Sequence, residues 1–334
     1  MTNPLPSRVI VIGTSAGGVP ALLQLVQDLP HDLDAAVLIV LHVGANASML
    51  PQLLGARCQW KTAHAQHGES PRAGAIYVAP PDHHLLLDAQ RMQLTRGPKE
   101  NHARPAIDPL FRSAALSWGR CVIGVILTGQ LDDGSAGLQA IKECGGITVV
   151  QNPLTAAQPG MPRAAMAAVQ PDLCVDLRDM GAALARIART APPHGPMPRP
   201  SRRIWHEVRI NKEEDVMSHV QQIGTPSSLT CPDCGGALFE IDDAQPLRFR
   251  CHIGHALSAE SLHSQQDELT EQMLRGGVRA LQEREMLLRR LALVSRGSGR
   301  LREALVGEHR ADEVREQALS LRRFIEGKAG EGGA

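Results

Sequence analysis

A serine lies in a short glycine-rich segment near the N-terminus. Gly13-Thr14-Ser15-Ala16-Gly17 gives the pattern G-x-S-x-G, which follows an apolar stretch and precedes amphipathic residues. Small neighbours permit a tight turn and close approach by a substrate, and a helix start there would aim backbone N–H groups at a developing oxyanion. The motif predicts Ser15 as a nucleophile and the N–H of Ala16 as an oxyanion donor. Such turns also bind phosphate in nucleotide-binding folds, so the motif alone leaves that alternative open.

A histidine and a pair of aspartates follow two other apolar stretches. His42 ends one of them, and Asp132-Asp133 come soon after Cys121–Leu127. The carboxyl ends of parallel strands meet in one crevice, where a carboxylate can orient a histidine and stabilise its imidazolium. Ser, His and Asp in this chain order therefore predict a triad. A solvent-facing histidine and an aspartate that only caps the next helix are the alternatives.

A second group of chemically distinctive residues lies in the C-terminal half. Cys231 and Cys234 form a C-x₂-C pair, and Cys251 and His255 follow with C-x₃-H spacing. Three thiolates and one imidazole suit a closed tetrahedral zinc site, with His252 as the reserve fourth ligand. A segment this small gains stability from a bound ion, although buried thiols without metal remain the alternative. We expect a structural rather than a catalytic zinc site, because protein ligands would fill all four positions.

The elements that must position these residues alternate between strand and helix. The predicted strands cover 8–12, 36–41, 75–79, 121–127, 147–150 and 173–175, and the predicted helices cover 19–29, 109–117 and 134–144. Continuous apolar runs such as 36–41 are typical of strands buried on both faces. The pattern predicts an α/β fold, a three-layer αβα domain with a mostly parallel sheet.

The chain divides by composition into four predicted segments. They are a catalytic domain over 1–190, a Pro-rich linker over 191–227, a zinc-ribbon-like module over 228–258, and a helical hairpin with its tail over 259–334. Five prolines within 191–203 favour an extended, solvated spacer. Apolar residues at helical spacing, interrupted near 296–299, predict two helices. These helices are expected either to self-associate or dock a partner, or to form a solvated pair.

Charge and composition limit the classes of partner. The chain has 35 basic and 35 acidic residues, and aromatic residues make up only 2%. The balanced charge gives no electrostatic attraction for nucleic acid, and the low aromatic content leaves few side chains on which bases could stack. No secretory signal and no apolar run of about 18 residues is present, so we expect a cytoplasmic protein that does not insert into membranes.

Several motifs together identify a resemblance to a known family. Besides the Ser15 turn and the Asp133 loop, the segments Tyr77–His84, Arg104–Ser113 and Gly160–Arg163 are similar to signatures of the chemotaxis protein-glutamate methylesterases. The resemblance to the catalytic domain of these CheB-type enzymes covers about residues 8–187. The C-terminal module resembles extensions on some stand-alone methylesterase-like proteins. Because the resemblance begins near Arg8, we expect no receiver domain before it.

The resemblance implies a role for each site residue. Ser15 would be the nucleophile, His42 the general base and Asp133 the orienting carboxylate, and the N–H of Gln130 would be the second oxyanion donor. The implied reaction is hydrolysis of glutamyl methyl esters on the cytoplasmic part of a chemoreceptor. Some relatives also deamidate receptor glutamines. The resemblance implies no cofactor for catalysis. Gln130-Leu131 departs from the common Met-Gly of the family. That departure and the added modules favour the alternative of a non-catalytic signalling scaffold that binds receptor or kinase partners.

Overall fold

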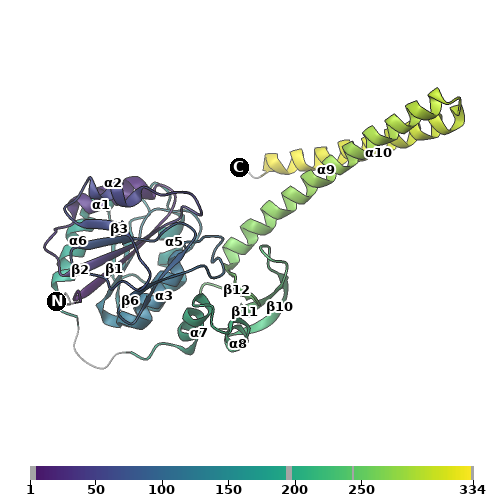
Figure 1. Cartoon of the computed structure of the whole chain (residues 1–334). Helices are drawn as coiled ribbons and strands as arrows, with labels where there is room; N and C mark the ends of the chain where they lie inside the picture. Colours follow the sequence, from purple (N-terminus) through teal and green to yellow (C-terminus); the bar gives the residue numbers. More distant parts are fainter. Residues whose placement is uncertain (1–4, 193–197, 243, 332–334) are drawn as a thin grey trace. The chain divides into compact units, whose positions relative to one another are not determined.

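The computed structural model describes residues 5–192, 198–242 and 244–331, the last four of these by their backbone alone. It divides into two compact units, Met1–Leu262 and His263–Ala334. Figure 1 shows the course of the chain. The first unit contains every predicted site residue.

A seven-stranded sheet forms the centre of the first unit. Its strands are β1 (Arg8–Thr14), β2 (Ala35–Leu41), β3 (Lys61–His64), β4 (Ala75–Val78), β7 (Val122–Ile126), β8 (Ile147–Gln151) and β9 (Leu173–Val175). The order is β3-β4-β2-β1-β7-β8-β9, and every pair is parallel. The chain therefore moves outward from β1 on one side and returns to its other side at β7. Such a reversal opens a crevice at the carboxyl ends of the strands around β1.

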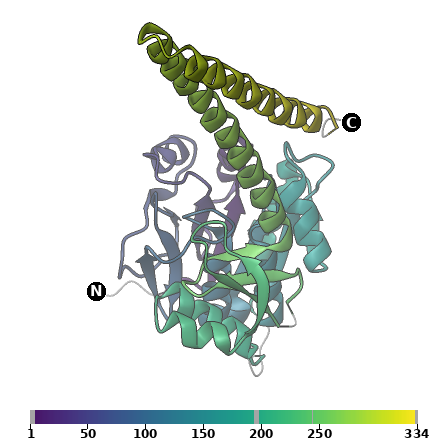
Figure 2. The same ribbon diagram turned by 90° about the vertical axis from the view of Figure 1, so that its right-hand side faces the viewer.

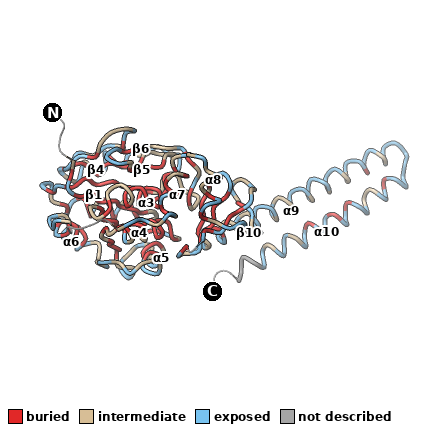
Figure 3. Tube along the Cα trace, turned by 90° about the horizontal axis from the view of Figure 1, so that it is seen from below, coloured by how far each residue is buried: buried red, intermediate tan, exposed pale blue. Residues whose placement is uncertain are grey.

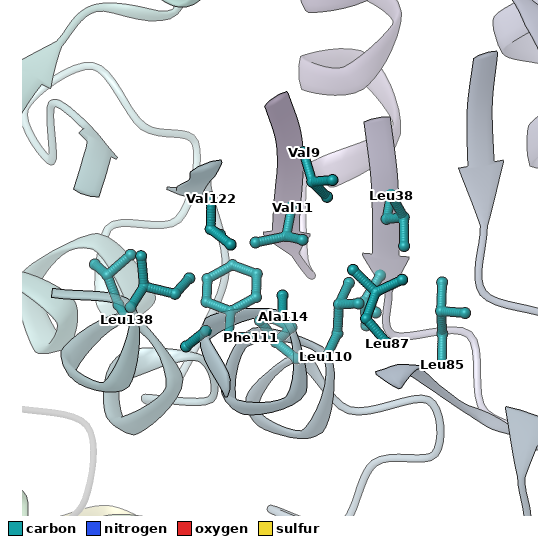
Figure 4. Packing of buried hydrophobic residues seen from close by; sticks show 14 of the residues in the cluster. Val9, Val11, Leu38, Leu85, Leu87, Leu110, Phe111, Ala114, Val122 and Leu138 are labelled. Atoms are coloured by element: carbon teal, nitrogen blue, oxygen red, sulfur yellow. The ribbon is translucent and has the colours of Figure 1, made fainter. Parts of the chain in front are cut away.

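Helices cover both faces of this sheet. They are α1 (Gly18–Asp28), α2 (Leu50–Gly55), α3 (Ile107–Trp118), α4 (Ser135–Glu143), α5 (Gly160–Ala168) and α6 (Leu177–Arg189). Buried residues of α1, α2 and α6 pack with Ile10 and Ile12 on one face, and those of α3, α4 and α5 pack with Val9 and Val11 on the other. Figure 4 shows Val11 above Phe111 of α3. Two buried faces explain why the strand sequences are apolar throughout.

These elements confirm the predicted three-layer αβα architecture. The sequence did not predict β3, α2, α5, α6 or the hairpin of β5 (His84–Asp88) and β6 (Arg91–Thr95). Strand β3 has only four residues, none of them fully buried, so it lacks the apolar run that marks the central strands. The hairpin packs by Leu85 and Leu87 beside α3. Cys121, the first residue predicted for the strand β7, instead ends a short 3₁₀ turn, Gly119–Cys121.

The range predicted as a linker contains regular structure. Helices α7 (Arg202–Asn211) and α8 (Val216–Gln221) lie within 191–227, and residues 193–197 of this range lie outside the described residues. Ser201 caps α7 through its Oγ, and Ile204 packs into the core on the face of the sheet that α3 covers. The prolines therefore precede a helix whose apolar side is buried. The predicted solvated linker over 191–227 thus does not extend over the whole of that range.

A small antiparallel sheet follows α8. Its strands are β10 (Gly224–Thr230), β11 (Ala237–Ile241), β12 (Arg248–Cys251) and β13 (Ala256–Ser258), paired in chain order. Strands β11 and β12 form an antiparallel hairpin that connects Cys234 to Cys251. We call residues 224–258 the metal module. Its buried apolar residues form two small clusters, one of which contains Cys231 and Cys251.

The second unit is a hairpin of two long helices. Helix α9 (Ala259–Gly297) and α10 (Leu301–Glu331) run antiparallel, which confirms the predicted hairpin (Figure 2). Arg289 pairs with Asp312 at 2.9 Å and Arg296 with Glu308 at 2.6 Å across the two helices. Figure 3 shows that both helices are mostly exposed. Among the described residues, no helix combines the length and the apolar composition that a membrane span requires.

Candidate active site

Ser15 lies at the carboxyl end of β1, where the chain turns into α1. Gly17 adopts φ 77°, a left-handed conformation that glycine takes without steric cost. The Ser15 N–H donates to the Thr128 carbonyl at 3.0 Å, and the Thr14 hydroxyl donates to the same oxygen at 2.8 Å. These bonds fix the serine turn to the loop that follows β7.

His42 lies between Ser15 and Asp133. Its Nδ1 is 3.2 Å from Ser15 Oγ, and its Nε2 is 2.7 Å from Asp133 Oδ2. A carboxylate accepts hydrogen bonds, so Nε2 carries the proton in the neutral ring and Nδ1 is free to accept from the serine hydroxyl. The His42 side chain is 20% exposed and that of Asp133 only 3%. The Asp133 carboxylate is therefore shielded from water, while the imidazole of His42 can reach a substrate.

Asp133 is surrounded by hydrogen-bond donors. Its carboxylate accepts from His42 Nε2, Asn101 Nδ2 and the backbone N–H groups of Ile107, Asp108 and Gly134. Burial opposes ionisation, but the hydrogen bond and charge of His42, with the smaller contributions of Ile107 and Asn101, hold the pKa of Asp133 below its usual range. Burial and the nearby Asp133 raise the pKa of Asp108 to about 7. Asp133 is therefore the member of this buried pair that ionises first.

The loop after β7 supplies the second candidate oxyanion donor. Within the described ranges, the N–H groups of Ala16 and Gln130 have no protein acceptor. A Cβ added to Gly129 would lie 3.1 Å from Ser15 Cβ, so only glycine lets this loop approach the serine. Leu131 adopts φ 58°, a left-handed conformation, at the position where the family commonly has glycine. Such strain at a non-glycine residue is concentrated at functional sites.

Sequence reasoning missed several residues of this site. Asn101 and Asp108 reach it from the segment before and at the start of α3, and Ser258 donates to Asp132 Oδ1 at 2.7 Å from β13. Asp108 lies in the Arg104–Ser113 motif, which was a signal for it. Asn101 and Ser258 carry no motif of their own, because only the tertiary packing brings them to the aspartates.

Comparison with known proteins defines the family. The sequence model described as CheB methylesterase matches residues 10–184, which is about half of the chain and includes Ser15, His42 and Asp133. The chain belongs to the CheB methylesterase family. The predicted family and its methylesterase-type enzyme class are therefore confirmed, and the CheB match ends before the metal module.

Relatives and a solved structure agree with this assignment. A putative protein-glutamate methylesterase/protein-glutamine glutaminase of Leptospira interrogans is 39% identical over 54% of this chain and 94% of its own. A protein-glutamate methylesterase/protein-glutamine glutaminase of Cupriavidus pinatubonensis is 42% identical over 48% of each chain. The crystal structure of the Thermotoga maritima CheB methylesterase catalytic domain matches with a TM-score of 0.52 and 29% identity, covering 54% of this chain and 98% of that one. The CheB catalytic fold thus accounts for the N-terminal half.

Beyond the CheB match, the metal module gathers its predicted ligands. The ligand atoms of Cys231, Cys234, Cys251 and His255 all lie within 4.8 Å of one another, whereas His252 is exposed and outside this group. A hydrogen bond from Cys231 outweighs burial and lowers the pKa of the Cys251 thiol. Three sulfurs and one imidazole nitrogen are a donor set suited to a tetrahedral ion.

Proposed function

We propose that this chain is a serine hydrolase that removes methyl groups from glutamate methyl esters of chemoreceptors. The hydrogen-bonded series Ser15–His42–Asp133 is the observation that carries the proposal. Its support is the membership in the CheB methylesterase family, in which relatives are named for this activity. The same relatives are also named glutaminases, so deamidation of receptor glutamines belongs to the proposal.

In the acylation step, Ser15 Oγ attacks the carbonyl carbon of the side-chain ester. His42 Nδ1 accepts the hydroxyl proton, while Asp133 holds the ring and stabilises the imidazolium. The tetrahedral oxyanion accepts hydrogen bonds from the N–H groups of Ala16 and Gln130. His42 then returns the proton to the departing methoxide, which leaves as methanol.

In the deacylation step, water attacks the acyl-serine with His42 again as the base. Collapse of the second tetrahedral intermediate releases the glutamate carboxylate and restores the Ser15 hydroxyl. With an amide substrate the leaving group is ammonia instead of methanol. Every proton is carried by His42, so the reaction requires no metal or organic cofactor.

We infer that the metal module holds a structural zinc ion. Cys231, Cys234, Cys251 and His255 would fill all four positions of a tetrahedral site, as in closed structural sites. The purified chain should contain about one zinc per molecule, as expected for four protein ligands around one ion. Metal analysis of the wild type and of Cys234→Ser checks this, because the variant should lose the ion.

The substrate determines where the chain would act. Receptor glutamates that carry methyl esters lie on cytoplasmic helices, so we propose a cytoplasmic enzyme whose partner is a chemoreceptor.

Apolar side chains exposed on the second unit, among them Leu287, Leu291 and Leu305, support self-association through the hairpin. Light scattering tests this: the molar mass in solution should be lower for Leu291→Glu than for the wild type.

Methanol release from methylated chemoreceptor cytoplasmic fragments tests the hydrolase. The wild type and the surface control Ser7→Ala should release methanol, and Ser15→Ala should fall by at least about 10³-fold. Full activity of Ser15→Ala would remove the proposed nucleophile. No release by the wild type would favour the scaffold instead.

A further inference from the structure

A loop between β6 and α3 connects the metal module to the active site. The Ala256 N–H donates to the Lys99 carbonyl at 3.1 Å, and the Asn101 N–H donates to the Ala256 carbonyl at 2.8 Å. Ala256 directly follows His255, one of the four candidate ligands. The loop therefore continues the pairing of β13 by two backbone hydrogen bonds, one residue away from the candidate metal site.

The side chain of Asn101 bridges the module and the catalytic carboxylate. Its Nδ2 donates to Asp133 Oδ1 at 3.1 Å, and its Oδ1 accepts from the Ser258 N–H at 3.1 Å. An ionised carboxylate only accepts and a backbone N–H only donates, so this orientation of the amide satisfies both neighbours. Asn101 has φ 48°, a left-handed conformation that asparagine tolerates better than most residues.

The module also holds the aspartate next to the catalytic one. Asp132 Oδ1 accepts from Ser258 Oγ at 2.7 Å and from Ser261 Oγ at 3.2 Å. The Ser261 N–H donates to Ser258 Oγ at 3.0 Å, which fixes that hydroxyl. Both residues of the Asp132-Asp133 pair are thus bonded to groups whose position depends on β13.

A buried ionic cluster fastens the same loop to β12. Glu100, next to Asn101, pairs with Arg112 of α3 and with Arg250 at 2.8 Å, and all three side chains are at most 1% exposed. Arg250 immediately precedes the candidate ligand Cys251, and its Nη1 donates to the Gly254 carbonyl at 2.9 Å. The turn between Cys251 and His255 is therefore bonded to the loop from inside the protein.

The other pair of candidate ligands touches the loop as well. His102 Nδ1 lies 3.7 Å from a carboxylate oxygen of Asp233, which stands between Cys231 and Cys234. Both halves of the candidate metal site thus contact residues 99–103. An ion that fixes the four ligands would also fix the surface against which this loop packs.

We propose that Asn101 is a positioning residue for Asp133, and that a zinc-class ion in the metal module keeps it in place. The proposal rests on the proposed hydrolase for its kinetic consequence. Of the donors to Asp133, Asn101 is the one whose own position is set by the module. Loss of the ion releases the Asn101 amide, Asp133 holds His42 less firmly, and the rate of acylation falls while substrate binding is retained.

Kinetics of the metal-stripped and zinc-reloaded 334-residue chain test the coupling. Removal of zinc from the wild type should lower kcat about tenfold with KM changed less than about twofold, the expected loss for one hydrogen bond to a charged group. Asn101→Ala should show a similar fall with zinc present, and stripping this variant should add less than about twofold, because coupled changes are not additive. Additive losses would overturn the proposal.

The isosteric Asn101→Asp separates positioning from a merely structural role. Aspartate can still accept from the Ser258 N–H, but it cannot donate to Asp133 and places a like charge beside it. This variant should lose more kcat than Asn101→Ala. A rate closer to the wild type than that of Asn101→Ala would show that only the bond to Ser258 matters. Cys234→Ser should mimic stripping, and Cys174→Ser, which changes an exposed cysteine outside the site, should not.

Hydrogen–deuterium exchange gives a readout that needs no enzymatic activity. In the wild type, metal removal should speed exchange at residues 99–103 and 131–134 by at least about tenfold, as local opening does. Unchanged exchange in both segments would overturn the proposal, whether or not the chain hydrolyses the ester. An inactive wild type with metal-dependent exchange would contradict the hydrolase but support the coupling.

Discussion

In the catalytic domain, Ser15 and His42 follow strands that are buried from end to end, whereas the metal module encloses only two small apolar clusters. The first arrangement positions polar groups by the packing of a parallel sheet. The second has Cys231 and Cys251 within one of its clusters and surrounds itself with ion pairs such as Arg248–Glu207. Because the module has little apolar surface to bury, the proposed metal ion and these ion pairs would contribute much of its stability.

The difference also concerns what each region needs from the other. The series Ser15–His42–Asp133 is assembled from β1, β2 and the β7 loop alone. The donors to the two aspartates, however, include Ser258 of β13 and Asn101, whose amide is hydrogen-bonded to Ser258. On the proposed mechanism, the domain would supply the reacting groups, and the metal module would help to hold them.

Asp133→Asn should produce the largest effect. The amide cannot stabilise the imidazolium and favours the wrong tautomer of His42, so kcat should fall by about 10³–10⁴-fold. Steady-state methanol release measures this, with circular dichroism to show that the sheet remains folded. A fall of only a few fold would mean that the Asp133 carboxylate is not required to hold and charge-stabilise His42.

Gly129→Ala tests how closely the β7 loop must approach the serine. The added methyl would lie 3.1 Å from Ser15 Cβ and would also displace Met161, so kcat should fall about 10²-fold, as small misplacements do. Gly276→Ala is the matched control, because an added Cβ there has no neighbour within 4 Å. Equal rates for both variants would refute the close approach.

Acidification should weaken the buried ionic cluster that joins Glu100 to Arg112 of α3 and Arg250 of the metal module. Despite burial, Arg112 and Arg250 hold the pKa of Glu100 at about 2, against 4.5 when unperturbed. The folded pKa is depressed, so the stabilisation is present above pH 4.5 and is lost as the pH falls toward 2; it is on the order of 3 kcal/mol. The melting temperature of wild type should therefore fall more steeply over this window than that of Glu100→Gln. Parallel curves would contradict the assigned charge state.

Gln130→Ala should have the smallest effect. Its side chain is exposed, and the proposed oxyanion donor is its backbone N–H, which alanine retains. The rate constant kcat should change less than about threefold, far below the loss of an oxyanion donor. A loss of 10²-fold, measured by the same methanol assay, would assign the function to the amide side chain.

The sequence predicted those features that depend on local chemistry. The glycine turn around Ser15, the buried runs of β2 and β7, and the cysteine spacing each constrain the backbone or the ligands directly. Helix α7 was hidden because nearby prolines favoured a linker, whereas its apolar side is buried in the first unit. Asn101 was not predictable, because its role arises from a tertiary contact between residues 99–103 and β13.

The most direct test of the central claim is covalent labelling with a serine-reactive fluorophosphonate, followed by mass mapping of the modified peptide. The account predicts one adduct, on Ser15, that forms quickly in the wild type, slowly in Asp133→Asn and not at all in Ser15→Ala. An adduct on another residue, or equal labelling of wild type and Ser15→Ala, would contradict it.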